Sequence, residues 1–400
     1  MKTWLPLLLW LPLTCCQALT LGDALQQAEA HNGELAAARA REQQAAAQAK
    51  GAGALPTAQF GVGGLGGNGP GLTNSNYSNL FRDDYYVFLN QSTGPFGSIG
   101  SKRRSAEFRH QAAQQAVLTQ QLTLEQSVKD EFYRLLAAQQ RLEVNQRNLE
   151  LAEEVLRIAK TRHKVGQVPR LDLMSAEVER NRAQQELVTA ASELRQSKAR
   201  LAPLLGDSPQ DLQAEGDLTP STPQLIHKDL QAHPRLAAAQ AELQQARQET
   251  LLAAQQGNPS ANLNLVHDLV IPNYVLQVTL SVPLDWGELG YEYAARQAAE
   301  KEAEAKLGQL QKQLESELEV ARGTYESALE NQSSYREKVL DPAEEMARVT
   351  EKGYRKGALP YSQLLIAQRL VSDLRRQFID KQLEVQLALD ALQAALGQHL

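Results

Sequence analysis

The chain has 400 residues, of which 42% are apolar, 22% are charged and only 5% are aromatic. The net charge of −6 argues against a nucleic-acid partner, which would call for a basic domain. The mean hydropathy of −0.41 excludes a protein built mainly of transmembrane helices. Because large aromatic side chains dominate compact cores, their scarcity favours long helices that pack through small residues.

The first eighteen residues are predicted to be a signal peptide. Lys2 supplies a positive charge, and Trp4–Leu13 is an apolar run too short for a membrane helix of about 20 residues. Small residues at Cys16 and Ala18 favour cleavage after Ala18. Cys15 and Cys16, the two cysteines of the chain, would then be removed, which leaves no disulfide. In an alternative interpretation Cys16 becomes a lipidated N-terminus; both interpretations predict export.

The sequence contains the same unit twice. Leu35–Ala40 recurs as Leu236–Ala241, and the Gly-x-x-Pro segment Val165–Pro169 recurs as Lys356–Pro360. The order of predicted elements is also shared between the halves. We therefore expect domains in this order: signal peptide 1–18, first repeat 19–206, linker 207–224 and second repeat 225–397.

Each half is predicted to hold a short helix, a very long helix and a third helix. Their ranges are 22–50, 103–163 and 170–203 in the first half, and 226–256, 289–355 and 361–396 in the second. A sixty-residue helix is about 90 Å long, which indicates coiled-coil packing. Leucines 135, 142, 149 and 156 follow the heptad spacing of a coiled coil. A soluble antiparallel coiled coil would show the same pattern.

Two strands with period-two alternation are predicted between the short and the long helix of each half. In 261–269 and 274–282 apolar side chains occupy every second position, over the length of a tilted membrane strand. The first half offers 58–62 and, less regularly, 85–93, with a glycine-rich loop at 67–84. The alternative to membrane strands is a pair of soluble β-hairpins, each with one face exposed to solvent.

Four strands cannot close a barrel, and an open edge in lipid leaves backbone groups without hydrogen-bond partners. If the strands are in a membrane, several chains must therefore share one barrel. Two chains would give eight strands and three would give twelve.

Several motifs resemble the TolC-type outer membrane efflux protein family. They are the opening Leu19-Thr20-Leu21-x-x-Ala24-Leu25, the pair His31-Asn32, and the two turns Gly166-x-x-Pro169-x-x-x-Leu173 and Gly357-x-x-Pro360-x-x-x-Leu364. Each motif is weak alone, but their duplicated order over residues 19–397 is specific.

The resemblance implies a mostly α-helical homotrimer with a small transmembrane portion. Four strands per chain would form a twelve-stranded β-barrel in the outer membrane of a Gram-negative bacterium, above a long periplasmic α-helical barrel. Such a channel is a passive exit duct for a tripartite efflux pump or a type I secretion system. Its implied partners are a periplasmic adaptor and an inner-membrane transporter. The alternative is a periplasmic coiled-coil adaptor or structural protein without a barrel.

The resemblance also implies functional residues at the two turns. The segments with Gly166, Pro169 and Leu173 and with Gly357, Pro360 and Leu364 would dock the adaptor, unless they are simple turns. Asp172 and Tyr354 match positions that can link neighbouring coiled coils near a closed aperture. Gln363 stands where family members often carry an acidic residue, which puts an acidic, cation-binding gate in doubt.

A basic cluster, Lys102, Arg103 and Arg104, follows the second predicted strand and is expected at the periplasmic membrane face, where lipid phosphates would pair with it. A solvated charge run is the alternative. Gly61–Gly66 fits a nucleotide-binding glycine pattern but lacks a βαβ unit around it, so strand and loop are the better interpretation. No catalytic motif and no metal-ligand spacing of histidines occur, so neither an enzyme nor a cofactor is expected.

Overall fold

A computed structural model describes residues 19–65, 84–206, 212–219, 230–268 and 273–397. The predicted signal peptide, most of the glycine-rich 67–84 loop and most of the 207–224 linker lie outside these residues. Among the described residues, every helix is too short or too polar to cross a membrane.

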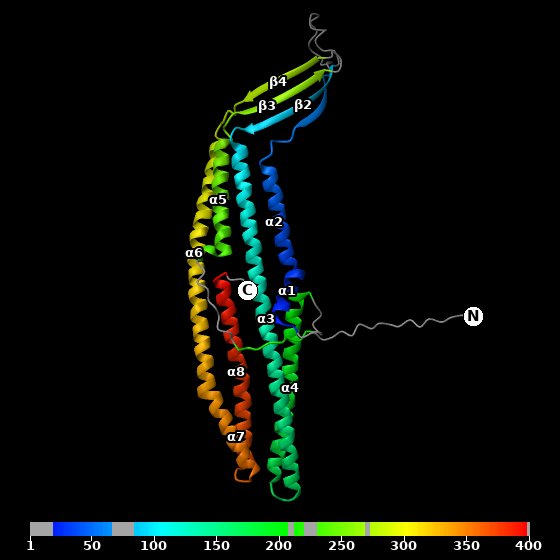
Figure 1. Cartoon of the computed structure of the whole chain (residues 1–400), viewed down its shortest axis with the longest axis vertical. Helices are drawn as coiled ribbons and strands as arrows, with labels where there is room; N and C mark the ends of the chain where they lie inside the picture. Colours follow the sequence, from blue (N-terminus) through cyan, green and yellow to red (C-terminus); the bar gives the residue numbers. More distant parts are fainter. Residues whose placement is uncertain (1–18, 66–83, 207–211, 220–229, 269–272, 398–400) are drawn as a thin grey trace, which may run out of the picture. The chain divides into compact units, whose positions relative to one another are not determined.

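The same order of elements occurs twice along the chain (Figure 1). The first series is α1 (Leu21–His31), α2 (Gly33–Ala52), β1 (Gln59–Leu65), β2 (Asp84–Pro95), α3 (Ser98–Lys164) and α4 (Arg170–Leu205). The second series is η1 (Leu230–Ala232), α5 (Pro234–Gln255), β3 (Ser260–Asp268), β4 (Asn273–Ser281), α6 (Glu288–Tyr335), η2 (Arg336–Leu340), α7 (Asp341–Arg355) and α8 (Tyr361–Ala395).

Three helices expected to be continuous are divided in the structure. The described part of the helix expected at 226–256 is broken at His233, between η1 and α5. The helix expected at 22–50 breaks at Asn32, whose side chain accepts a hydrogen bond from the Leu35 amide at 2.8 Å and so caps α2. The helix expected at 289–355 is interrupted by the π-helical turn η2. Pro342 follows at the start of α7. Because proline lacks an N–H group and its ring crowds the preceding turn, a regular α-helix cannot continue undisturbed there.

The chain folds as two compact units, and each unit takes segments from both halves of the sequence. One unit comprises Met1–Leu35, Gln120–Asp229 and Leu314–Leu400. The other comprises Ala36–Thr119 and Leu230–Gln313. We call them the hairpin unit and the sheet unit, because the first holds the two helical turns and the second holds all four strands.

The sheet unit contains one antiparallel sheet in the order β1-β2-β3-β4. Phe60 pairs with Leu89, Leu89 with Leu265, and Leu265 with Leu276, so one face is apolar across all four strands. These side chains remain exposed in the chain; Val278, on the same face, keeps 70% of its surface. The opposite face carries polar side chains such as Gln277 and Thr279. The alternation of apolar and polar side chains predicted for the strands is therefore confirmed. Among the described residues, no element packs on the apolar face.

Two glycines of β1 are required by aromatic rings on β2. A Cβ atom on Gly61 would lie 2.4 Å from the Phe88 ring, and one on Gly63 would lie 2.4 Å from the Tyr86 ring. Such distances are well inside van der Waals contact. These glycines therefore allow the aromatic rings of β2 to pack closely against β1. This agrees with the interpretation of the glycine pattern as part of a strand.

The hairpin unit packs α4 through alanine. Ala176, Ala183 and Ala190 are seven residues apart, and each is at least 93% buried. This is the heptad spacing of a coiled-coil seam, with small side chains that permit close approach of the helices. Leu135 of the predicted α3 heptad is fully buried, whereas Leu142 is half-buried. The low aromatic content of the chain is consistent with this packing.

A cluster of buried charges lies between α3 and α8 in the same unit. The Lys129 ammonium donates a hydrogen bond to the Gln393 side-chain oxygen at 3.1 Å, and both Lys129 and Asp390 are about 95% buried. Desolvation by burial raises the pKa of Asp390 to about 7 and lowers the pKa of Lys129. Asp130, beside them on α3, has a pKa raised by burial to about 6.

The Gly61→Ala substitution should destabilise the sheet, because the new methyl group collides with the Phe88 ring. We expect a loss of roughly 1–3 kcal/mol in the free energy of unfolding, measured by thermal unfolding in detergent. Gly308→Ala in α6, where a Cβ atom meets nothing within 4 Å, is the matched control and should be neutral or stabilising. Equal effects of the two substitutions would show that the Phe88 contact does not constrain β1.

The Asp390→Asn substitution should change how stability depends on pH. A carboxyl group whose pKa is raised on folding stabilises the folded state at low pH, and this contribution is lost as pH rises through about 7. Asn does not titrate, so the variant should gain melting temperature relative to wild type between pH 5 and pH 8. Glu143→Gln, an exposed carboxylate of α3, should show no such trend. A constant difference for Asp390→Asn would contradict the buried titration.

Candidate functional site

The two Gly-x-x-Pro turns close in the same way. Gly166 and Gly357 have φ angles of +73° and +76°, a left-handed conformation that favours glycine at helix ends. The Gln167 amide donates to the Arg162 carbonyl oxygen, and the Ala358 amide to the Gly353 carbonyl oxygen, both at 2.9 Å.

The prolines and leucines of the two motifs have different surroundings. Pro169 and Pro360 are exposed and precede the first residues of α4 and α8. Leu364 is buried and Leu173 packs against the same apolar cluster. The exposed apolar side chains near the first turn are instead Val165 and Leu171. The glycines and prolines therefore shape the exposed turns, whereas the two motif leucines pack in the apolar cluster beneath them.

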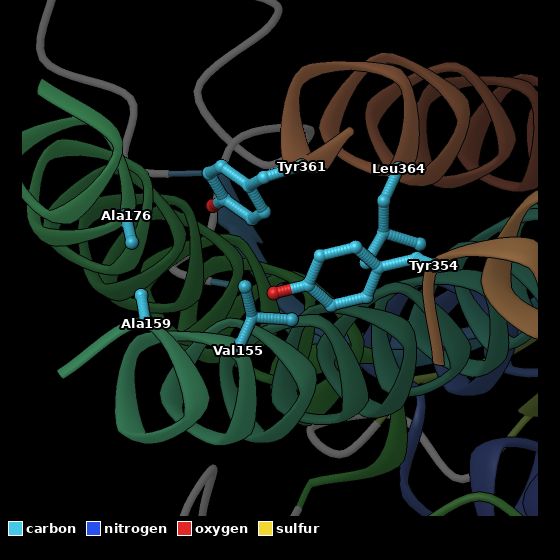
Figure 2. Close-up of a cluster of buried hydrophobic side chains, with 6 residues drawn as sticks. All are labelled: Val155, Ala159, Ala176, Tyr354, Tyr361 and Leu364. Carbon is cyan, nitrogen blue, oxygen red and sulfur yellow. The ribbon is translucent and has the colours of Figure 1, made fainter. Parts of the chain in front are cut away.

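An apolar cluster joins the α3–α4 hairpin to the α7–α8 hairpin (Figure 2). Its buried members are Val155 and Ala159 from α3, Ala176 from α4, Tyr354 from α7, and Tyr361 and Leu364 from α8. The rings of Tyr354 and Tyr361 lie 6.1 Å apart between centroids. Burial raises the pKa of Tyr361 to about 12, so this phenol stays neutral at physiological pH.

Tyr354 contacts an arginine that sequence reasoning missed. The guanidinium carbon of Arg162 lies 4.7 Å from the centroid of the Tyr354 ring, a cation–π distance. The Tyr354 hydroxyl points toward Val155 (Figure 2). Among the described residues, no hydrogen bond joins Tyr354 to the half-buried Asp172. No sequence signal could have found Arg162, because it pairs across two hairpins and follows no periodicity within one helix.

Gln363 lies exposed in the first turn of α8. The described residues contain no group of three or more His, Cys, Asp or Glu side chains arranged to hold a metal ion.

The basic cluster lies in the sheet unit, near the start of α3. Lys102, Arg103 and Arg104 are exposed, and Arg103 pairs with Glu107 at 2.8 Å. Helix α3 begins at Ser98, so the cluster occupies its second turn.

Two exposed aromatic side chains follow β4, at the end of the sheet from which α3 also begins. Pro95 of β2 pairs with Ser260, which pairs with Ser281 of β4. The strands β2 and β4 therefore stop at the same end of the sheet. Beyond β4, Trp286 is 94% exposed and Tyr291 is 82% exposed. Sequence reasoning did not single them out, although an exposed Trp and Tyr beside basic residues are typical of a membrane–water interface.

Comparison with known proteins shows which family the chain belongs to. The family model described as outer membrane efflux protein matches residues 24–207 and again residues 225–398. The chain belongs to this family. It is therefore an outer membrane efflux channel and not an enzyme. The resemblance found in the sequence is confirmed.

Individual relatives are distant. The cobalt-zinc-cadmium resistance protein CzcC of Cupriavidus metallidurans is 26% identical over 70% of this chain and 70% of its own length. The pyoverdine export outer membrane protein OpmQ of Pseudomonas putida is 28% identical over 94% of this chain and 85% of its own. The crystal structure of CusC matches with a TM-score of 0.81 at 17% identity, covering 95% of this chain and 92% of CusC, which shows the shared fold.

The contact between Arg162 and Tyr354 can be tested by comparing two substitutions. Tyr354→Phe keeps the ring and should leave stability nearly unchanged, whereas Arg162→Gln should cost about 0.5–1 kcal/mol. Thermal unfolding of the two variants measures the cost of each substitution. If Tyr354→Phe costs as much as Arg162→Gln, the hydroxyl group and not the ring makes the important contact.

Proposed function

We propose that three copies of this chain form the exit duct of a tripartite efflux pump, with one twelve-stranded β-barrel shared among them. The observation that carries the proposal is the open sheet, in which β1 and β4 are the outer strands. Successive strands run antiparallel, so β1 of one copy can pair antiparallel with β4 of the next. In lipid such pairing satisfies the backbone groups of both edges. Twelve strands leave a lumen, whereas the interior of an eight-stranded barrel is largely filled by side chains.

The outer membrane lipid would contact the apolar face of the sheet. Phe60, Leu265 and Val278 belong to that face, and its exposure in the single chain supports this assignment. Trp286 and the basic cluster Lys102, Arg103 and Arg104 would then mark the periplasmic interface, where aromatic rings and positive charges meet headgroups.

The helical turns would meet a periplasmic adaptor, which joins the duct to an inner-membrane transporter. Support comes from the exposed Gly166, Pro169, Gly357 and Pro360 and from the apolar side chains beside them. Transport through this chain is passive, because energy is supplied by the transporter. On this proposal residues 1–18 are a signal peptide, and the repeats 19–206 and 225–397 are joined by the linker 207–224.

The aperture at the turns would close through contacts between the two hairpins. We assign Tyr354 to this role through its contact with Arg162, and Asp172 and Gln363 would lie near the opening.

The cargo class we propose is a small solute and not a polypeptide. CzcC is named for cobalt, zinc and cadmium resistance and OpmQ for pyoverdine export, and neither name refers to protein secretion.

The assembly is tested by the native mass of the protein, extracted in mild detergent from a separated outer membrane fraction. We expect a species of three chains in that fraction alone. A monomer in the periplasmic extract would contradict the duct and favour a periplasmic adaptor. A deletion strain then tests the cargo: increased sensitivity to cobalt, zinc or cadmium, or retention of a siderophore, supports a small solute, whereas retention of a secreted polypeptide contradicts it.

A further inference from the structure

The polar face of the sheet carries one side-chain amide on each strand. Gln59 of β1 pairs with Asn90 of β2, and Asn90 pairs with Asn264 of β3. Asn264 pairs in turn with Gln277 of β4. Side chains directly opposite each other on neighbouring antiparallel strands have Cβ atoms about 5 Å apart. The amides therefore lie at one level across the whole sheet, and we call them the amide row.

The positions on either side of the amide row are also uncharged. Ser92, Asn262 and Thr279 pair with one another on the side nearer to α3. On the other side Phe88 pairs with Val266. Although 22% of the residues of the chain are charged, no charged side chain lies on this face among the strand residues whose side chains the structure describes.

The lack of charge on this face has a consequence for transport. Charged side chains that line a pore set which ions pass, because carboxylates favour cations and lysines or arginines favour anions. A side-chain amide has no net charge, but its N–H groups donate hydrogen bonds and its oxygen accepts them. A lumen lined by amides and hydroxyl groups therefore offers hydrogen bonds to solutes of either charge and an electrostatic preference for neither.

We propose that the amide row lines the lumen of the barrel and makes this part of the channel indifferent to the sign of the charge on its cargo. This rests on the proposed duct, in which the apolar face with Leu265 and Val278 contacts lipid and the opposite face is turned to water. Each copy of the chain would contribute one amide row. The cargo that the barrel accepts is then any hydrogen-bonding small solute, anionic as well as cationic.

The proposal is tested with thiol reagents of opposite charge. Cys15 and Cys16 are the two cysteines of the chain and lie in the predicted signal peptide, so wild type provides the unreactive background. Gln277→Cys places a thiol in the amide row, and Val278→Cys places one on the apolar face. The purified channels are reconstituted in lipid vesicles. The labelling rates with cationic trimethylammonioethyl methanethiosulfonate and anionic sulfonatoethyl methanethiosulfonate are then followed by intact mass.

In Gln277→Cys, the ratio of the cationic to the anionic rate should lie within about threefold of the ratio for 2-mercaptoethanol, because no charge of the sheet lies close to the thiol. Val278→Cys should stay unlabelled, since a thiol in lipid does not form the reactive thiolate. Adding Asn264→Asp to Gln277→Cys places a carboxylate about 5 Å from the thiol and should raise the ratio about tenfold.

The outcomes separate the neutral lumen from the duct. A ratio within the stated range in Gln277→Cys, raised by Asn264→Asp, supports the proposal. A ratio outside that range, or no labelling of Gln277→Cys, overturns the neutral lumen and leaves the duct if Val278→Cys is unlabelled. No rise on adding Asn264→Asp also overturns the neutral lumen. Labelling of Val278→Cys at the rate of Gln277→Cys overturns duct and neutral lumen together. Should these variants fail to fold, Gln59→Cys with and without Asn90→Asp decides in the same way.

Discussion

The backbone hydrogen bonds of the sheet impose the main constraint on this chain. β1 and β4 are the outer strands, and no further described strand pairs with them. Their outward N–H and C=O groups cannot remain unpaired in lipid. On the proposed duct, a chain with four strands and one exposed apolar face therefore depends on other copies of itself. Helix α3 spans 67 residues and packs along its side and not around a compact core.

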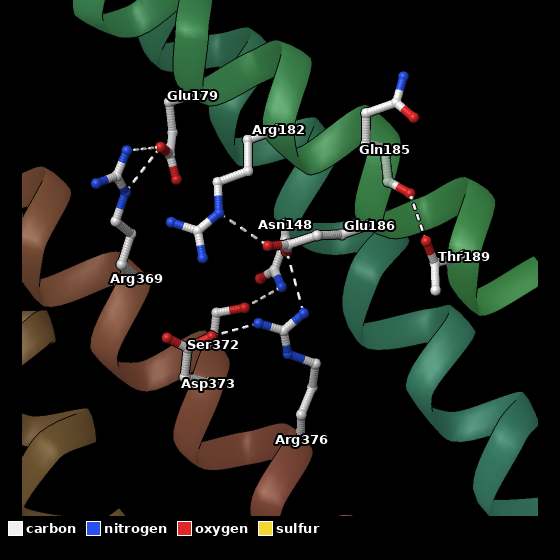
Figure 3. Close-up of polar contacts among 10 residues, drawn as sticks. All are labelled: Asn148, Glu179, Arg182, Gln185, Glu186, Thr189, Arg369, Ser372, Asp373 and Arg376. Carbon is white, nitrogen blue, oxygen red and sulfur yellow. Dashed lines mark hydrogen bonds and ion pairs between the residues drawn. The ribbon is translucent and has the colours of Figure 1, made fainter.

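The hairpin unit packs its own helices together through small side chains and charges. Alanine at heptad spacing lets α4 approach its neighbours closely, and glutamates beside it reach arginines of α8 (Figure 3). Such an interface gains less free energy from apolar burial than one built of leucine or phenylalanine. Separating its helices would therefore expose less apolar surface and cost less free energy.

The residues of the Gly-x-x-Pro motif have different structural roles at the two turns. Gly166 and Gly357 supply the left-handed backbone that ends a helix, and the prolines begin the next one. Leu364 is buried between the hairpins and leaves the surface of its turn to other residues. The membership in the outer membrane efflux protein family rests on the whole duplicated pattern, and the local geometry shows which members of each motif remain accessible.

The sequence by itself determined most helices and strands, the strand alternation and the family, because periodicity, turn residues and repeats are local properties of the chain. It did not determine the break at Asn32 or the π-helical turn before Pro342, since capping and backbone crowding compete there with a strong helical pattern. The pairing of Arg162 with Tyr354 and of Glu179 with Arg369 was decided only by the tertiary structure. Each pair joins residues about 190 positions apart, and the relative rotation of packed helices sets which side chains meet.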